Sequence, residues 1–196
     1  VAERMKLFGF LAFAVVMTGF IYPMEGSWTW GGNPVFGMYT LGDLGFLDFA
    51  GSGIVHMAGA AAAFAGVILV GARNGKYGPN GEVNAIPGAN LPLATLGTFI
   101  LWLGWFGFNV GSTTEGTTQA VQSLLNTFVA AAAGMIGWIV IEKIKDGKPT
   151  TLGACSGVVA ALVAITPAAG HVGGLSSIVF GLVAGVGCYF LIGLKL

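Results

Sequence analysis

The sequence predicts an all-α membrane protein, a polytopic bundle of transmembrane helices with no separate soluble domain in residues 1–196. Only 8% of the residues are charged and 55% are hydrophobic, whereas about a quarter of the residues in soluble domains are charged. Apolar stretches recur at close to the ~20 residues that a helix needs to cross a bilayer. Loops rich in Gly and Pro separate the six expected spans, which are residues 7–22, 48–71, 91–111, 120–141, 151–168 and 173–194.

Glycine makes up 34 of the 196 residues, which suits transmembrane helices that pack closely. Small-xxx-small spacing, which lets helix backbones approach one another, occurs at Gly107/Gly111, Gly153/Gly157 and Gly181/Gly185. Together these pairs predict a tight bundle with little room for a wide aqueous pore.

The basic residues predict the orientation in the membrane. When the loops are numbered alternately, all eight Lys and Arg fall on one side of the six spans: Arg4, Lys6, Arg73, Lys76, Lys143, Lys145, Lys148 and Lys195. The positive-inside rule makes that side cytoplasmic, so both ends of this segment are expected inside a cell membrane. The opposite loops carry the acids Glu25, Asp43 and Glu115. This outer face would attract a cation, or it is an aromatic belt with ordinary solvated acids.

Composition also excludes several classes of function. The formal net charge is zero, so there is no basic face for nucleic acid. Cys155 and Cys188 lie in apolar runs with no CxxC motif or Cys/His cluster, so neither a zinc site nor a disulfide scaffold is expected. We expect these cysteines to be buried free thiols, and we expect no metal and no cofactor.

Two ionisable residues stand in the apolar stretch "DFAGSGIVHMAG", residues 48–59. Asp48 is expected in the first turn of the second span, where its carboxylate can accept backbone N–H bonds. It could also set the electrostatics near an outer cation site. His56 follows eight positions later, which is about 12 Å deeper along a helix and close to the middle of the membrane. A histidine there is either functional or a hydrogen-bonding contact between helices.

Aromatic residues near a hydroxyl group suggest a site for a small cation at the outer side. "GWFGFNVGS" ends with Ser112, and "SWTWGG" contains Trp28 and Trp30. Aromatic faces and one hydroxyl can hold a small cation, but the same rings could simply anchor the helices at the interface. His171, in the short turn "PAAGHVGG", is expected to be an ordinary loop residue.

Several blocks of the sequence resemble the ammonium transporter family (Amt/Mep, with Rh proteins as distant relatives). "DFAGSGIVHMAGAAAAFAGVILVGAR" resembles the signature of that family. "WTWGG", "LPLATLGTFILWLGWFGFNVGS", "GKPTTLGACSG" and "AITPAAG" resemble other blocks in the family's order. The resemblance covers essentially the whole chain and implies transmembrane transport of ammonium or ammonia, with methylammonium as an analogue and with no enzyme activity.

The resemblance also assigns roles to individual residues. A Trp matching Trp30 and a Ser matching Ser112 recruit ammonium at the outer face, and a Phe matching Phe108 helps to gate the entrance. His56 matches the first of two histidines in a narrow hydrophobic pore. Asp48 matches an acid near the entrance that gives structural and electrostatic support.

The fold implied by the resemblance has eleven transmembrane helices in two inverted halves, assembled as a homotrimer with one pore per subunit. The six spans here resemble the fourth to ninth helices, so we expect an internal segment of a longer chain. The second pore histidine would then lie outside this sequence. A cytoplasmic PII-type regulator is among the partners that the resemblance suggests.

Three alternatives remain open from the sequence. The protein could be a sensor that retains the ammonium site and signals through a cytoplasmic module. It could be a Rh-like gas channel, although "SWTWGG" and the Amt-type signature speak against that. It could also be a membrane protein in which His56 is purely structural.

Overall fold

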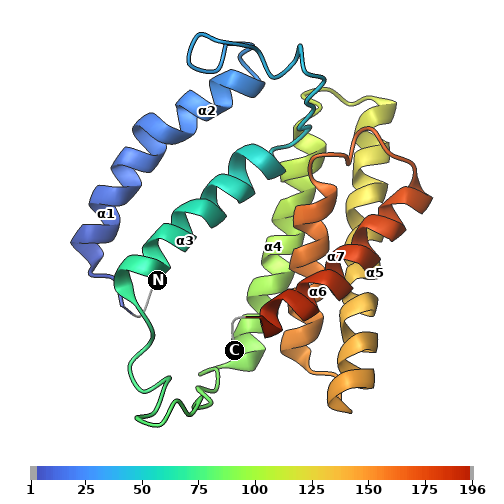
Figure 1. The fold of residues 1–196 in the computed structure, drawn as a ribbon. Coiled ribbons are helices and arrows are strands. Elements are labelled where there is room, and N and C mark those ends of the chain that lie inside the picture. The colour runs from blue at the N-terminus through green and yellow to red at the C-terminus, as the bar shows by residue number, and fades with distance from the viewer. Residues whose placement is uncertain (1–3, 195–196) are drawn as a thin grey trace. The chain divides into compact units, whose positions relative to one another are not determined.

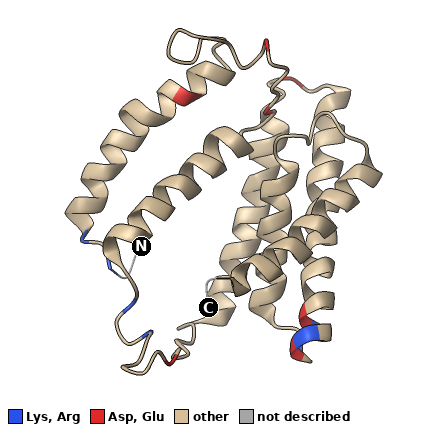
Figure 2. Cartoon of the chain, in the orientation of Figure 1, with Lys and Arg blue, Asp and Glu red and all other residues tan. Residues whose placement is uncertain are grey.

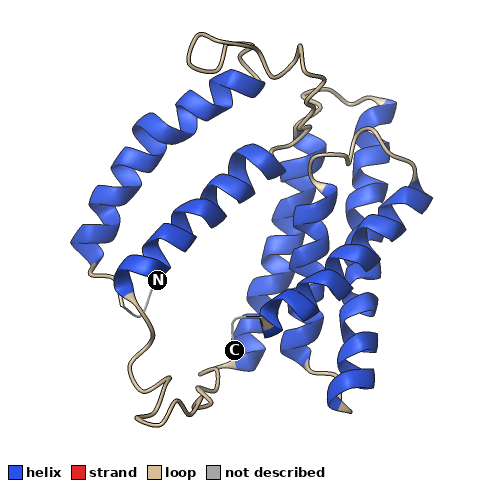
Figure 3. Ribbon diagram, in the orientation of Figure 1, coloured by secondary structure: helices blue, strands red, loops and turns tan. Residues whose placement is uncertain are grey.

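The computed structural model describes residues 4–194, and this part of the chain contains helices, turns and loops but no β-strand (Figure 3). Lys195, one of the residues expected on the cytoplasmic side, lies outside the described residues. The chain divides into two compact units, Val1–Pro87 and Gly88–Leu196. The helices are shown in chain order in Figure 1.

The first helix is longer than the expected span of residues 7–22. α1 (Leu7–Val16), the π-helical segment η1 (Met17–Ile21) and α2 (Tyr22–Thr29) form one continuous apolar helix of 23 residues. It continues beyond Pro23 because the wider π-helical turn precedes the proline. Proline has no N–H, and its ring clashes with the carbonyl four residues earlier in a regular α-helix. Glu25 therefore lies in a helix, whereas we expected it in an outer loop.

The second helix of the same unit carries the signature histidine. The π-helical segment η2 (Ser52–Met57) continues directly into α3 (Ala58–Val70), giving 19 apolar residues in one helix. The helix begins four residues later than the expected span of 48–71, so Asp48 lies before the helix rather than in its first turn. α3 ends at Val70, and the next residue, Gly71, has a φ of 70° that suits glycine.

The N-terminal segment lies against the end of α3. The Arg4 guanidinium donates hydrogen bonds from Nε and Nη2 to the Val70 carbonyl oxygen, at 3.2 and 3.1 Å, and from Nη1 to the Asn74 side chain. A cation stabilises the carbonyl end of a helix. In this unit, the basic residues thus gather where α1 begins and α3 ends (Figure 2).

The second unit is a bundle of four helices: α4 (Leu91–Gly111), α5 (Thr118–Asp146), α6 (Thr151–Ile165) and α7 (Gly174–Gly193). The Asn90 side chain accepts the Leu93 N–H at 2.9 Å and so caps α4. Thr150 caps α6 in the same way through the Gly153 N–H, at 2.9 Å.

α6 is shorter than the expected span of residues 151–168. Its 15 residues fall below the ~20 that usually cross a bilayer. The helix ends at Ile165, although Thr166 keeps helical dihedrals of φ −51° and ψ −43°. Pro167 has no N–H with which to continue the helical hydrogen bonds. Among the described residues, five other helices are long and apolar enough to cross a membrane.

Glycines bring α5, α6 and α7 into close contact. A Cβ atom on Gly157 would lie 2.7 Å from the Trp138 Cβ, and one on Gly134 would lie 2.6 Å from the Gly157 carbonyl oxygen. No real side chain fits at these distances, so the α5 and α6 backbones meet at these glycines. Of the three small-xxx-small pairs, Gly181/Gly185 and the Gly157 member of Gly153/Gly157 lie at such backbone contacts. Gly153 lies against the Glu142 carboxylate, and Gly107/Gly111 faces open space.

Candidate functional site

The five residues singled out by the sequence fall in different units. Trp30, Asp48 and His56 belong to residues 1–87, and Phe108 and Ser112 belong to residues 88–196. Each group has its own local geometry.

Asp48 fixes the start of the helix that carries the histidine. Its side chain is only 5% exposed, and its carboxylate accepts four backbone N–H groups. The Oδ1 atom accepts from Gly51 and Ser52 at 3.0 and 2.8 Å, and Oδ2 accepts from Gly53 and Ile54 at 2.7 and 3.1 Å. The N–H groups at a helix start have no partner within the helix, and the dipole there favours a negative charge. One carboxylate therefore supplies acceptors that the helix itself cannot supply.

Trp30 is bound to the same segment through the main chain. Its indole Nε1 donates a hydrogen bond to the Asp48 carbonyl oxygen at 3.0 Å. The ring also lies against Gly51, because a Cβ atom there would be 2.9 Å from the Trp30 Cη2 atom and 2.8 Å from the Val55 Cγ2 atom. Gly51 has a φ of 114°. Only glycine combines this backbone conformation with so close a ring.

The Trp30 ring keeps an open surface although its N–H is bound. The residue is 50% exposed and directly follows α2. An aromatic face with such access can attract a small cation. The hydrogen bond to the Asp48 carbonyl oxygen holds the ring in place.

His56 lies in the π-helical segment η2 and is half-buried. The Gly51 carbonyl oxygen accepts the Val55 N–H at 2.7 Å and the His56 N–H at 3.4 Å. The second bond spans five residues and defines the π-helical turn. Such turns are frequent at functional sites, and this one changes the angular position of His56 from that of a regular α-helix.

Phe108 and Ser112 lie one turn apart at the end of α4. The Ser112 hydroxyl donates to the Phe108 carbonyl oxygen at 2.7 Å. Since its hydrogen is used in this bond, the exposed Ser112 oxygen offers lone pairs to an external donor. The Phe108 ring packs against Trp105, with centroids 5.9 Å apart at 56°.

The structure also shows polar contacts that sequence reasoning missed. The buried Trp105 donates from Nε1 to the Thr166 hydroxyl at 2.8 Å, and the fully buried Asn109 donates to the Thr127 hydroxyl at 3.0 Å. The sequence signal that could have indicated these contacts was the presence of a polar side chain within an apolar helix. The sequence did not reveal the partners, which lie on other helices.

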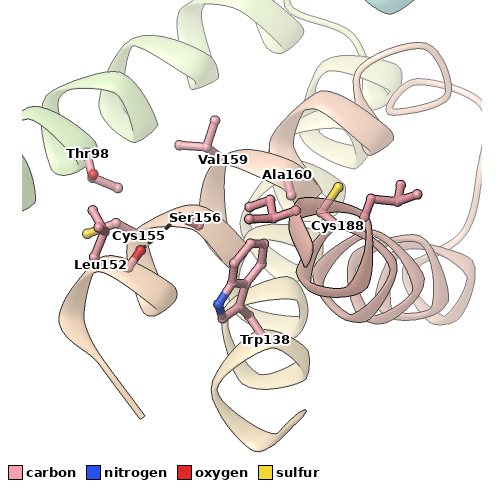
Figure 4. A pocket seen from close by; sticks show the side chains of 10 residues that line it. Thr98, Trp138, Leu152, Cys155, Ser156, Val159, Ala160 and Cys188 are labelled. Atoms are coloured by element: carbon pink, nitrogen blue, oxygen red, sulfur yellow. Dashed lines mark hydrogen bonds between the residues drawn. The ribbon is translucent and has the colours of Figure 1, made fainter. Parts of the chain in front are cut away.

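His171 lies in the exposed turn between α6 and α7, which is the position expected for it. Cys155 and Cys188 are free thiols, but they are half-buried where full burial was expected. Both line an open apolar groove of about 610 Å³ in the second unit, together with Trp138 and Ser156 (Figure 4). None of the five expected site residues lines this groove.

These features first define a class of protein. The long apolar helices among residues 4–194 are those of a multi-pass membrane protein. Trp30, Asp48 and Ser112 lie at helix ends, outside the middle of these apolar segments. The comparisons with known proteins then identify the family.

The family model for the Ammonium Transporter Family matches residues 1–196. The chain is 46% identical over 190 residues to ammonium transporter Amt2 of Archaeoglobus fulgidus, covering 94% of this chain and 41% of that protein. It is 42% identical over 189 residues to the ammonium transporter of Bacillus subtilis, covering 96% and 44% of the two chains.

Solved structures give the same result. A structure titled "Sensor Amt Protein" matches with a TM-score of 0.91 at 36% identity, covering 97% of this chain and 47% of that one. Mep2 of Candida albicans matches with a TM-score of 0.86 at 36% identity, covering 98% and 41%. The chain belongs to the ammonium transporter family, a family of transport proteins rather than enzymes. It spans less than half the length of these relatives.

Proposed function

We propose that the protein containing this segment moves ammonium nitrogen across the cell membrane. Trp30, Phe108 and Ser112 recruit ammonium at the outer side, and His56 lines the path of ammonia. The observation that carries the proposal is the hydrogen bond from Trp30 to Asp48, because Asp48 also holds the start of the helix that bears His56. Within one unit, the recruiting ring and the pore helix are thus held by a single residue.

The chemistry of the recruiting side chains suits ammonium. The cation has four N–H donors and no acceptor. Aromatic faces attract it by about 0.5–1 kcal/mol when exposed and by about 2 kcal/mol when desolvated. The Ser112 oxygen accepts one N–H, since its own hydrogen is donated to Phe108. These contacts replace part of the water shell that the cation loses.

The nitrogen then crosses as neutral ammonia. A charge at the centre of a bilayer costs about 2.5–3.5 kcal/mol on insertion scales and more in other estimates. A neutral molecule avoids this cost. An imidazole offers ammonia one donor and one acceptor, which matches the part that His56 plays in this proposal. No bond other than a bond to a proton is made or broken, so the protein is not an enzyme.

The membrane orientation and the partners belong to the same proposal. The Arg4 contact with the end of α3 places two basic segments at one end of the first unit, and we assign this end to the cytoplasm. We also propose that residues 1–196 form part of a single transmembrane transporter domain and include no separate soluble domain. Following the family resemblance, the full protein is a homotrimer, with a PII-type regulator on its cytoplasmic face.

Uptake by the full-length protein in proteoliposomes tests the assignment of His56. We expect His56→Ala to lower methylammonium uptake severely, whereas His171→Ala, at the exposed histidine between α6 and α7, leaves uptake unchanged. Size-exclusion chromatography of both variants verifies that the trimer assembles. Normal uptake by an assembled His56→Ala trimer would remove His56 from the path.

A second candidate function is ammonium sensing, which the match to the structure titled "Sensor Amt Protein" favours. A sensor would keep the recruiting residues and use binding to drive a signalling module. The full gene distinguishes the two functions, since a kinase, cyclase or similar domain after the last helix supports sensing. Binding of methylammonium without uptake by the full-length protein would also support it.

A further inference from the structure

A group of buried polar side chains lies where α4, α5 and the α6–α7 turn meet in the second unit. Asn109 on α4 and Ser123 and Asn126 on α5 are each 0% exposed. None of them belongs to the proposed recruiting or pore residues. Polar groups buried this completely normally have hydrogen-bond partners.

The orientation of the Asn126 amide is fixed by its nitrogen. The Nδ2 atom donates to two main-chain carbonyl oxygens of the α6–α7 turn, those of Ala169 at 2.8 Å and Val172 at 2.6 Å. If the amide were turned over, its Oδ1 atom would face these two carbonyl oxygens, and none of the three oxygens could donate a hydrogen. The Asn126 Oδ1 atom must therefore face away from this turn.

The orientation of the Asn109 amide is fixed by the Thr127 hydroxyl. Its Nδ2 donates to the Thr127 hydroxyl oxygen at 3.0 Å. The Thr127 hydroxyl donates its own hydrogen to the Ser123 carbonyl oxygen at 2.7 Å, so towards Asn109 it can only accept. The nitrogen of Asn109 must face Thr127, which leaves its Oδ1 as an acceptor.

Within this group, three buried atoms have no hydrogen-bond partner in the described part of the chain: Asn109 Oδ1, Ser123 Oγ and Asn126 Oδ1. Two of them can only accept a hydrogen bond, whereas the serine hydroxyl can donate one. Leaving a buried group unsatisfied costs about 1–3 kcal/mol. A small molecule with two donors and one acceptor would satisfy all three.

The three residues occupy neighbouring positions around α5. At about 100° per residue, Ser123 lies between the directions of Asn126 and Thr127 on α5, one turn closer to the start of the helix. Asn126 is on the side of the α6–α7 turn, and Thr127 is on the side that contacts Asn109. The Ser123 side chain thus leaves α5 in a direction between those of Asn126 and Thr127, the partner of Asn109.

We propose that one internal water molecule is bound at this site. It donates one hydrogen bond to Asn109 Oδ1 and one to Asn126 Oδ1, and it accepts the hydrogen of the Ser123 hydroxyl. Buried waters typically make about three such bonds to otherwise unsatisfied groups. The water links α4, directly after Phe108, to α5 and through Asn126 to the α6–α7 turn. A dehydrated ammonium ion suits the site less well, because the serine hydroxyl would have to turn its hydrogen away from it.

A structure of the full-length protein, at a resolution that shows ordered waters and in sodium salts free of ammonium, tests the proposal. We expect a single peak within hydrogen-bond distance, about 2.7–3.2 Å, of all three atoms. Direct contacts among the side chains with no peak would overturn the proposal. A peak that appears only when ammonium is added would also overturn it, since the site would then hold the substrate.

A serine variant tests the role of the third ligand. Ser123→Ala removes the only donor, so the peak should disappear or lose most of its occupancy. Ser177→Ala is the matched control, because Ser177 is equally buried but donates its hydrogen to the Gly173 carbonyl oxygen. We expect the peak to persist in this variant. An undiminished peak in Ser123→Ala would contradict the three-ligand site.

Discussion

The indole nitrogen of Trp30 donates a hydrogen bond to the main-chain carbonyl oxygen of Asp48, 18 residues further along the chain. Through this bond, the aromatic ring proposed to attract ammonium is held by the residue whose carboxylate starts the η2–α3 helix. The ring and the helix therefore depend on the same loop conformation.

The Trp30 hydrogen bond should contribute to substrate recruitment. Trp30→Phe keeps an aromatic face but loses the N–H, and a hydrogen bond contributes about 0.5–1.5 kcal/mol. We expect the KM for methylammonium uptake by the full-length protein to rise about two- to tenfold. Trp28→Phe is the control, since Trp28 packs edge-on against Phe36 with centroids 4.8 Å apart. Equal effects of the two variants would show that the bond to Asp48 has no special part.

The Asp48 carboxylate should contribute mainly to stability. In Asp48→Asn, one oxygen becomes an NH₂ group that cannot accept the two N–H groups facing it. Leaving buried donors unsatisfied costs about 1–3 kcal/mol each, so the Tm of the detergent-solubilised protein should fall clearly. Asp43→Asn, at an exposed acid in the same loop, should leave Tm unchanged. If Asp48→Asn keeps the wild-type Tm, these hydrogen bonds do not hold the helix start.

Gly51 should tolerate no side chain. Gly51→Ala adds a Cβ atom against the Trp30 and Val55 side chains at a positive φ, and the backbone strain alone costs about 1–3 kcal/mol. We expect both a lower Tm and reduced methylammonium uptake, because the new atom displaces the Trp30 ring. Gly45→Ala separates the two effects, since Gly45 has a φ of 74° but no atom within 4 Å of its added Cβ. This control should lower Tm and spare uptake, and an equal loss of uptake in both variants would argue against ring displacement.

Close packing of α5 and α7 should depend on Gly185. A Cβ atom there would meet the Gly134 carbonyl group and lie 3.0 Å from the Gly134 Cα atom. Gly185→Ala forces the two helices apart, and overpacking of this kind costs about 1–3 kcal/mol. Gly187→Ala on the same helix faces open space. Thermal unfolding should show a clear loss of Tm for the first variant and none for the second, and a similar Tm for both would contradict the close contact.

Composition and local pattern were enough to predict several features. The low charge and the recurring apolar stretches predicted an all-helical membrane protein, and the motif order predicted the ammonium transporter family. Both predictions are confirmed by the helices and by the family match. They succeed because a bilayer imposes length and polarity on each helix separately, so that each span is visible in its own residues.

Helix boundaries were predicted less well where a proline or a glycine lies near the end of a helix. The first helix runs past Pro23 to Thr29 because a π-helical turn accommodates the ring, and α6 ends at Ile165, before Pro167. Gly51 and Asp48 likewise move the start of the second helix to Ser52. A proline can end a helix or be accommodated in it, and the surrounding backbone decides which occurs.

The sequence by itself determined which residues lie in membrane-length apolar segments and which family the chain belongs to, because both are properties of the local order of side chains. Only the tertiary structure decided how the singled-out residues are held. The Trp30 bond to Asp48, the π-helical setting of His56 and the fixed amides of Asn109 and Asn126 involve main-chain or distant partners. Such partners have no signature in a local pattern, since any residue type can supply a carbonyl oxygen.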